Sequence, residues 1–144
     1  MYKKILIPLD NSLTDRAILD HIRPLVKLTG AEIVLVHVAD GFGARLQNDL
    51  NLADSAEMTE DYAYLETIRK NLSNDGATVK ALLVQGKDPG EGILSVAEEE
   101  KCDLIAMATH GHRFVKDMIL GSVADHLRHH TNIPILMIRT PMSK

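Results

Sequence analysis

Five short apolar runs alternate with amphipathic segments along this chain, and the alternation restricts the fold more than any other feature. The segments between the runs carry apolar residues at helical spacing, for example Ile18, Ile22 and Val26. Strands that alternate with helices build a parallel sheet covered on both faces. The pattern therefore predicts an α/β fold, a three-layer sandwich around one five-stranded parallel sheet, with strands at residues 5–9, 33–38, 79–84, 104–108 and 133–138.

Turn and capping residues mark where the helices between these strands begin and end. Ser12 can cap the first helix, with Asp15 as a weak second half of a capping box. Pro24 removes a backbone hydrogen bond inside that helix and predicts a kink, and Gly30 suits the residue that ends it. Asp88 before a proline predicts the start of a later helix.

Length and composition exclude several classes of partner. The 144 residues suit a single domain, which we expect to span residues 1–144. A net charge of −4 and an aromatic content of 3% are untypical of a nucleic-acid-binding protein. No apolar stretch approaches the roughly 20 residues of a membrane span. Cys102, the only cysteine, cannot form an internal disulfide, which fits a cytoplasmic protein, and we expect it to be a small buried side chain. We predict no nucleic-acid or membrane partner.

The segment after the fourth strand carries the features of a phosphate cradle. Ligands of open α/β sheets bind outside the carboxyl ends of the strands, and there Gly111 is followed by nine residues and then Gly121 and Ser122. We predict that Gly121 and Ser122 open the last helix, whose free N–H groups favour an anion. Arg113 and Lys116 add positive charge. The alternative is a loop that only turns the chain and caps the helix.

Several histidines raise the question of a metal site. His126 and His130 are four residues apart on one face of a predicted helix, and His110 and His112 flank the loop. No cysteine or carboxylate completes a ligand set at a diagnostic spacing. We therefore expect no metal held by protein side chains, and we interpret the helical pair as a solvated face.

Four segments together resemble the universal stress protein family over nearly the whole chain. Residues 5–12 (ILIPLDNS) resemble its opening strand and turn, residues 35–38 (LVHV) the end of its second strand, and residues 132–138 (NIPILMI) its last strand. The nucleotide-binding branch carries G-x-x-G, nine residues and G-[ST], which Gly111, Gly121 and Ser122 match. Ala108 replaces the first glycine, and its methyl group narrows the approach to the backbone.

The resemblance implies an adenine-nucleotide-binding domain with strand order 3-2-1-4-5. On the base side, Asp10 would hydrogen-bond the adenine, Val38 would pack on it and Pro8 would shape the adjoining wall. Met107 and Ala108 would lie near the ribose. The resemblance thus places the base and sugar at the ends of the first, second and fourth strands.

The phosphates would lie further along the chain, and the expected ligand is ATP. A divalent ion, Mg²⁺ or Mn²⁺, would be held by phosphate oxygens more than by the protein. The residues that border or hold the phosphates would be Gly111, His112, Arg113, Gly121, Ser122 and Val123. The resemblance also implies an antiparallel homodimer through the last strand, which is predicted to begin at Ile133 and end at Ile138.

Three functions remain open from the sequence. The first is an ATP-binding regulator of a stress response, a nucleotide-dependent sensor or interaction module with an unidentified protein partner. It would hydrolyse ATP slowly at most, because no residue is clearly placed as a general base. The second is a slow ATP hydrolase or phosphotransfer enzyme that uses His110, His112 and Ser122. The third is a nucleotide-free interaction protein on the same scaffold, which Ala108 favours.

Overall fold

The computed structural model describes residues 1–40, 51–86, 88–109 and 115–140, without the side chains of residues 40, 51–58 and 115–121. Strands and helices alternate in this part of the chain, as the sequence predicts. The strands are β1 (Lys4–Pro8), β2 (Glu32–Asp40), β3 (Val79–Gly86), β4 (Leu104–Thr109) and β5 (Ile135–Arg139). The helices are α1 (Thr14–Thr29), α3 (Asn51–Asn74), α4 (Pro89–Glu99) and α5 (Val115–His130).

The five strands form one parallel sheet of order β3-β2-β1-β4-β5, which confirms the predicted order. The central strand β1 is buried on both faces, and Ile5, Leu6 and Ile7 are fully buried. Strand β5 lies at an edge, as expected from the proline in the last apolar run. Pro134 precedes β5, and its carbonyl accepts a 3.0 Å hydrogen bond from the N–H of Ile105.

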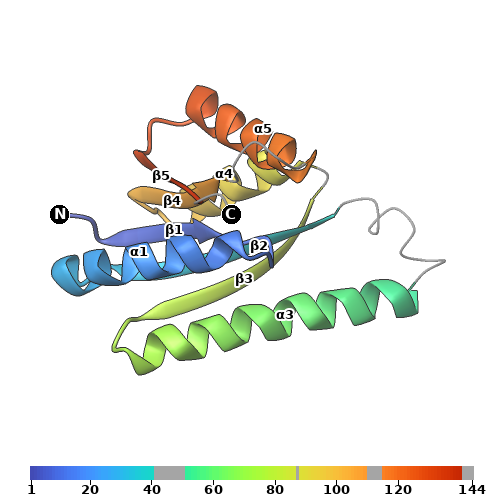
Figure 1. Cartoon of the computed structure of the whole chain (residues 1–144), viewed down its shortest axis with the longest axis horizontal. Coiled ribbons are helices and arrows are strands. Elements are labelled where there is room, and N and C mark those ends of the chain that lie inside the picture. The colour runs from blue at the N-terminus through green and yellow to red at the C-terminus, as the bar shows by residue number, and fades with distance from the viewer. Residues whose placement is uncertain (41–50, 87, 110–114, 141–144) are drawn as a thin grey trace.

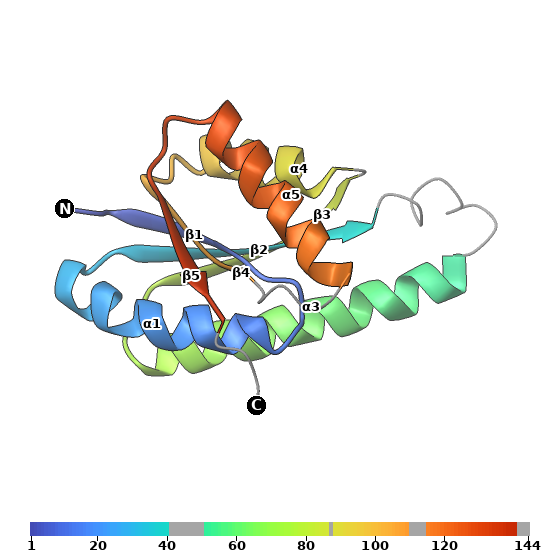
Figure 2. The same cartoon turned by 45° about the horizontal axis from the view of Figure 1, so that its top comes forward.

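Helices cover both faces of the sheet, with α1 and α3 on one face and α4 and α5 on the other (Figures 1 and 2). Alternating side chains of each strand supply the two cores. Ile5 and Ile7 of β1 pack with apolar residues of α1 and α3, whereas Leu6 packs with those of α4 and α5. The sandwich therefore has two hydrophobic layers that share one sheet.

Two of the predicted helix boundaries are confirmed in detail. Gly30 ends α1 in the left-handed conformation, with φ of 69°, and its N–H donates to the carbonyl of Val26. Asp88 caps α4, where its carboxylate accepts hydrogen bonds from the N–H groups of Gly90 (2.9 Å) and Glu91 (3.4 Å). Helix α1 runs continuously through Pro24.

Three boundaries differ from the sequence-based expectation. Leu13, not Ser12, is the N-cap of α1, and no side chain caps it. Residues 40–53 show no clear helical period, which predicts a loop, but helix α3 begins at Asn51 within this stretch. Helix α5 begins at Val115, six positions before Gly121. A glycine inside a helix costs only about 1 kcal/mol, which the helix-spaced apolar residues before Gly121 can outweigh.

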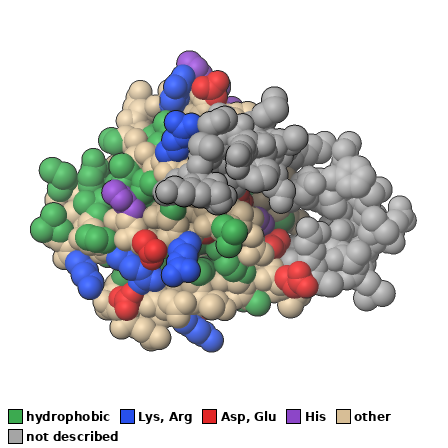
Figure 3. Space-filling view, in the orientation of Figure 1, with side chains coloured by type: hydrophobic (Ala, Val, Ile, Leu, Met, Phe, Trp, Pro, Cys, Tyr) green, Lys and Arg blue, Asp and Glu red, His purple; other side chains and the backbone are tan. Residues whose placement is uncertain are grey.

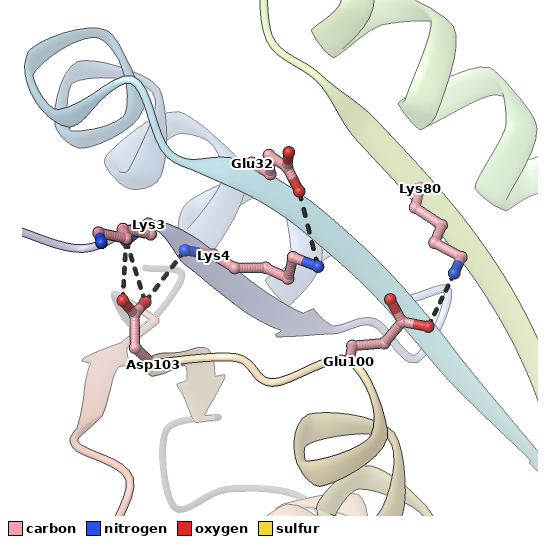
Figure 4. Close-up of polar contacts among 6 residues, drawn as sticks. All are labelled: Lys3, Lys4, Glu32, Lys80, Glu100 and Asp103. Atoms are coloured by element: carbon pink, nitrogen blue, oxygen red, sulfur yellow. Dashed lines mark hydrogen bonds and ion pairs between the residues drawn. The ribbon is translucent and has the colours of Figure 1, made fainter.

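The amino ends of the strands are joined by polar contacts at the surface (Figure 4). The Asp103 carboxylate accepts hydrogen bonds from the backbone N–H groups of Lys3 (2.9 Å) and Lys4 (3.0 Å). The Lys4 ammonium lies 3.6 Å from the carboxylate of Glu32. In Figure 3, basic and acidic side chains of the described residues are interspersed on the face shown. None of the helices in the described part of the chain has the length and apolarity needed to cross a membrane.

Candidate functional site

A cavity of about 310 Å³ opens at the carboxyl ends of the strands. Its floor comes from β1, β2 and β4, and its walls come from the β1–α1 turn and from α4 and α5. This volume lies within the range of small-molecule sites. The lining residues are Pro8, Leu9, Asp10, Asn11, Ser12, Thr14, Asp15, Val36, His37, Val38, Pro89, Ile93, Met107, Ala108 and Val123.

Six of the residues predicted from the sequence meet in this cavity. They come from four segments that are distant along the chain, and the fold brings them together at one end of the sheet. They are Pro8, Asp10, Val38, Met107, Ala108 and Val123.

The remaining predicted residues fall into two groups. Gly111, His112 and Arg113 lie outside the described residues. Gly121 lies within α5, and Ser122 is an exposed residue of the same helix. The expectation that Gly121 and Ser122 open a helix is therefore wrong for this structure. The N–H groups of α5 that lack a partner within the helix belong to its first turn, which begins at Val115.

The wall formed by Val38 is backed closely by glycines. A Cβ atom on Gly92 of α4 would lie 3.0 Å from Cγ2 of Val38, and one on Gly86 would lie 3.7 Å from its Cγ1. A contact of 3.0 Å is tighter than ordinary van der Waals packing. Because Gly92 has no side chain, Val38 can pack close to α4 and does not extend further into the cavity.

A buried carboxylate holds the β1–α1 turn that borders the cavity. Asp15, on the first turn of α1, is 3% exposed. Its carboxylate accepts hydrogen bonds from the N–H groups of Asp10 (3.2 Å) and Asn11 (2.9 Å) and from the Tyr64 hydroxyl of α3 (2.6 Å). Asn11 has a φ of 61°, the left-handed region that Asn tolerates better than most residues. Asp15 therefore stabilises the turn that carries Asp10.

Burial raises the pKa of Asp15 to about 6. The Tyr64 hydrogen bond favours the ionised form, but desolvation outweighs it, and the nearby Asp10 charge raises the pKa of Asp15 further. The pKa of Tyr64 is raised well above its ordinary range by burial and by its hydrogen bond to Asp15. At neutral pH the tyrosine is therefore the proton donor and the carboxylate the acceptor.

A second polar pair connects α3 to the cavity. His37 of β2 places Nδ1 2.8 Å from the carbonyl oxygen of Leu9 and Nε2 3.3 Å from Oδ2 of Asp61 on α3. The ring therefore lies between the chain that leaves β1 and helix α3. The side chains of His37 and Asp61 are 15% and 14% exposed. Two residues of α3, Asp61 and Tyr64, thus reach residues that line the cavity.

The sequence match to known proteins decides the family. The family model described as the universal stress protein family matches residues 1–139. The chain belongs to this family. Universal stress protein MJ0577 of Methanocaldococcus jannaschii is 31% identical over 156 aligned positions, which cover 96% of this chain and 96% of that protein. The solved structure of MJ0577 gives a TM-score of 0.86 at 34% identity and covers 99% of both chains.

Two other solved universal stress proteins that resemble this chain contain nucleotides. One is in complex with cAMP and has a TM-score of 0.70 at 18% identity, covering 97% of this chain and 98% of that one. The other, from Archaeoglobus fulgidus, is in complex with dAMP and has a TM-score of 0.64 at 20% identity, covering 95% and 98%. At these identities the likeness establishes a shared universal stress protein fold.

Sequence reasoning missed four polar residues of this universal stress protein that lie at or behind the cavity. In the sequence Asp15 gives only a weak capping signal, and His37 belongs only to a strand motif. Asp61 and Tyr64 carried no local signal, because their partners lie far away in the sequence. Of the four, Asp15 alone could have been found, because a carboxylate in the first turn of a helix can accept hydrogen bonds from N–H groups of the preceding turn.

Cys102 and the histidine pair of α5 have structural rather than ligand-binding surroundings in this universal stress protein. Burial raises the pKa of the Cys102 thiol to about 11, and the side chain is 6% exposed, which confirms the buried position predicted for it. The rings of His126 and His130 stack, with centroids 4.1 Å apart. In the described part of the chain, no group of three or more potential ligands is arranged to hold a metal ion.

Proposed function

We propose that this universal stress protein is a single domain that binds an adenine nucleotide in the cavity at the carboxyl ends of β1, β2 and β4. The observation that carries the proposal is the convergence of six residues predicted from the sequence on that one cavity. The cavity also lies beside the junction of β1 and β4, where the strand order reverses. This is the position at which open α/β sheets bind ligands.

The base and ribose would occupy the part of the cavity closest to the strands. Asp10 would hydrogen-bond the adenine, Val38 would pack on it, and Pro8 would form the adjoining wall. Met107 and Ala108 would lie beside the ribose. The apolar side chains at the floor supply the surface that a planar base buries, and the turn supplies the polar contact.

The phosphates would meet the α5 side of the cavity, where Val123 lies. Gly111, His112 and Arg113 would border them, and backbone N–H groups of α5 would hold them. In one arrangement these groups belong to the turn that begins at Val115. In the other, that turn unwinds when the nucleotide binds and frees the N–H groups of Gly121 and Ser122.

The proposed ligand is ATP with Mg²⁺ or Mn²⁺, and the proposed role is that of a nucleotide-dependent sensor or interaction module in a cytoplasmic stress response. The nucleotide complexes of two universal stress proteins of the same fold support an adenine nucleotide. Asp15 accepts three hydrogen bonds, so it is occupied in holding the turn. A sensor fits this arrangement better than a rapid hydrolase.

The experiment is to purify the protein without added nucleotide, denature it and identify any released adenine nucleotide by chromatography. ATP titration calorimetry and ATP loss over several hours then follow on nucleotide-free protein. Bound ATP with little turnover is the expected result. No released nucleotide, together with no thermal shift in millimolar ATP, would refute the proposal, and rapid turnover would refute the sensor role.

A matched pair of variants locates the site. Asp10→Ala removes a carboxylate beside the cavity, and Asp20→Ala removes one from the exposed surface of α1, where it lies 3.8 Å from Arg16. We expect only Asp10→Ala to weaken ATP binding. Equal affinities for both variants and the wild type would show that the base does not lie against Asp10.

We further propose that two copies associate through β5. The strand lies at an edge of the sheet, and edge strands present unpaired backbone groups. Met137 on β5 is 40% exposed. Multi-angle light scattering should give a dimer for the wild type and a monomer for Met137→Lys. A wild-type monomer at high micromolar concentration would exclude this interface.

A further inference from the structure

Tyr64 and Asp15 connect three segments that are far apart in the sequence. Tyr64 lies on α3, Asp15 on α1, and the Asp15 carboxylate reaches the backbone of the turn after β1. Oδ1 accepts from the N–H of Asp10, and Oδ2 accepts from both the N–H of Asn11 and the Tyr64 hydroxyl. The carboxylate therefore joins the turn after β1 to α3.

We propose that Asp15 and Tyr64 are positioning residues of the nucleotide site, in which the Tyr64 hydroxyl holds the Asp15 carboxylate and this carboxylate holds the turn that presents Asp10. This inference rests on the proposed function and goes beyond it, because it makes α3 part of the site. Asp10 and Asn11 both line the cavity. Tyr64 is not among the lining residues, so it acts through Asp15.

Burial of the Asp15 carboxylate raises the free-energy cost of losing any of its hydrogen bonds. Asp15 is 3% exposed, and water cannot readily replace a hydrogen bond that is lost there. Removal of the Tyr64 hydroxyl takes away one of the three hydrogen bonds that the buried carboxylate accepts from Asp10, Asn11 and Tyr64. Protonation of Asp15 has a related effect, because a neutral carboxyl group accepts the hydrogen bonds of the Asp10 and Asn11 N–H groups less strongly than a carboxylate does. Either change loosens the turn and lets Asp10 leave its place at the cavity.

Titration of Asp15 supplies a test that a general packing defect would not pass. The titratable groups that act on Asp15 in the described residues are Asp10 from the turn and Tyr64 from α3. The Tyr64 hydrogen bond lowers the pKa of Asp15. In Tyr64→Phe the pKa of Asp15 therefore rises, and the acid limb of the ATP-binding profile moves to higher pH. In Asp15→Asn that limb disappears.

The chain offers a matched control on the same helix. Tyr62 of α3 is 51% exposed, and its hydroxyl donates a 3.3 Å hydrogen bond to Glu66, away from Asp15. Tyr62→Phe makes the same chemical change as Tyr64→Phe without touching the turn. The ATP molecule itself titrates in the same pH range, but its titration is common to all the proteins and cancels in the comparison.

The experiment measures the dissociation constant of MgATP from pH 5 to 8 for the wild type, Tyr62→Phe, Tyr64→Phe, Asp15→Asn and the Tyr64→Phe/Asp15→Asn double variant. At pH 7.5 we expect about a fivefold loss for Tyr64→Phe, about a tenfold loss for Asp15→Asn and no change for Tyr62→Phe. The double variant should be no weaker than Asp15→Asn alone, because Tyr64 acts through Asp15.

Wild-type affinity in Tyr64→Phe, an unshifted acid limb or additive losses in the double variant would overturn the positioning role while leaving nucleotide binding intact. If the wild type itself binds no MgATP, the proposed function and this inference fall together. Thermal melts identify a variant that has unfolded. Tyr64→Phe, which removes one oxygen atom, carries the test if Asp15→Asn does not fold.

Discussion

Asp103 and Asp15 lie at opposite ends of the sheet, and each carboxylate accepts hydrogen bonds from two consecutive backbone N–H groups. Their pKa values nevertheless move in opposite directions. At Asp103 burial is slight, and the N–H groups of Lys3 and Lys4 outweigh it and lower the pKa. At Asp15 deep burial and the Asp10 charge outweigh the same kind of contact and raise the pKa. The difference in burial, not in hydrogen bonding, therefore explains why the pKa is lowered at the amino ends of the strands and raised beside the cavity.

The largest expected difference between the two ends of the sheet is in ligand binding. Val38→Phe adds a ring to the wall of the cavity and should weaken ATP binding on the order of 100-fold by filling the space of the base. Val79→Phe makes the same change in a partly buried residue at the amino end of β3 and should leave the affinity unchanged. Calorimetry on variants with cooperative thermal melts checks both, and equal losses would contradict the placement of the ligand.

The second effect is on the pH dependence of stability. The pKa of Asp15 rises from 3.8 to about 6 on folding, so its stabilising contribution is complete below pH 4 and is lost as the pH rises through 6. Relative to Asp15→Asn, the wild type should lose on the order of 3 kcal/mol of unfolding free energy between pH 4 and 7. Urea unfolding across this range provides the measurement.

The control for that prediction is Asp103→Asn at the other end of the sheet. A lowered pKa means that the contribution of Asp103 is present above its unfolded pKa and is lost as the pH falls through its folded value. The difference between the wild type and Asp103→Asn should therefore grow from pH 3 to 5 and stay level to pH 8. Parallel curves for the two variants would show that the two carboxylates are equivalent.

A third, smaller effect, on ATP affinity, distinguishes the two arrangements proposed for the phosphates at the carboxyl ends of the strands. Alanine is about 1 kcal/mol more favourable than glycine inside a helix, so Gly121→Ala stabilises α5 as the structure shows it. If the turn before Gly121 must unwind, the affinity for ATP falls about fivefold. An unchanged dissociation constant would instead place the phosphates at the start of α5, at Val115.

The smallest effect concerns two glycines of α4. A methyl group on Gly92 would press on Val38 and move it toward the cavity, so Gly92→Ala should weaken ATP binding about two- to threefold. A methyl group on Gly90 would lie 2.8 Å from Cδ2 of His126. Gly90→Ala should therefore lower the melting temperature by disturbing the packing of α4 on α5, while the affinity of the folded protein stays the same.

Much of the fold could be predicted from the sequence because its signals are local. The five apolar runs identify the strands, and Gly30 and Asp88 mark helix boundaries through backbone preferences of single residues. The strand order came from family resemblance, and the structure confirms it. The predicted start of α5 is wrong because Gly121 resembles a helix boundary, whereas the helical spacing of the apolar residues before it extends the helix to Val115.

The site was predictable only in part, for a different physical reason. Asp10, Val38 and Met107 lie at strand ends, which the sequence identifies, so their meeting at one cavity follows from the parallel sheet. The contact between Asp15 and Tyr64 spans 49 positions and depends on the rotation of α3 on the sheet. Neither periodicity nor a motif specifies that rotation, so the sequence does not predict the buried hydrogen-bond network.

The central place of β1 has a consequence for synthesis on the ribosome. The strand is made first, yet its neighbour β4 and the Asp103 carboxylate that receives the N–H of Lys3 come 100 positions later. At about 5–20 residues per second, β1 waits roughly 5–20 s for that partner. During this interval Leu6 lacks the residues of α4 and α5 that later cover it, and we expect nascent-chain chaperones to bind β1 until translation passes β4.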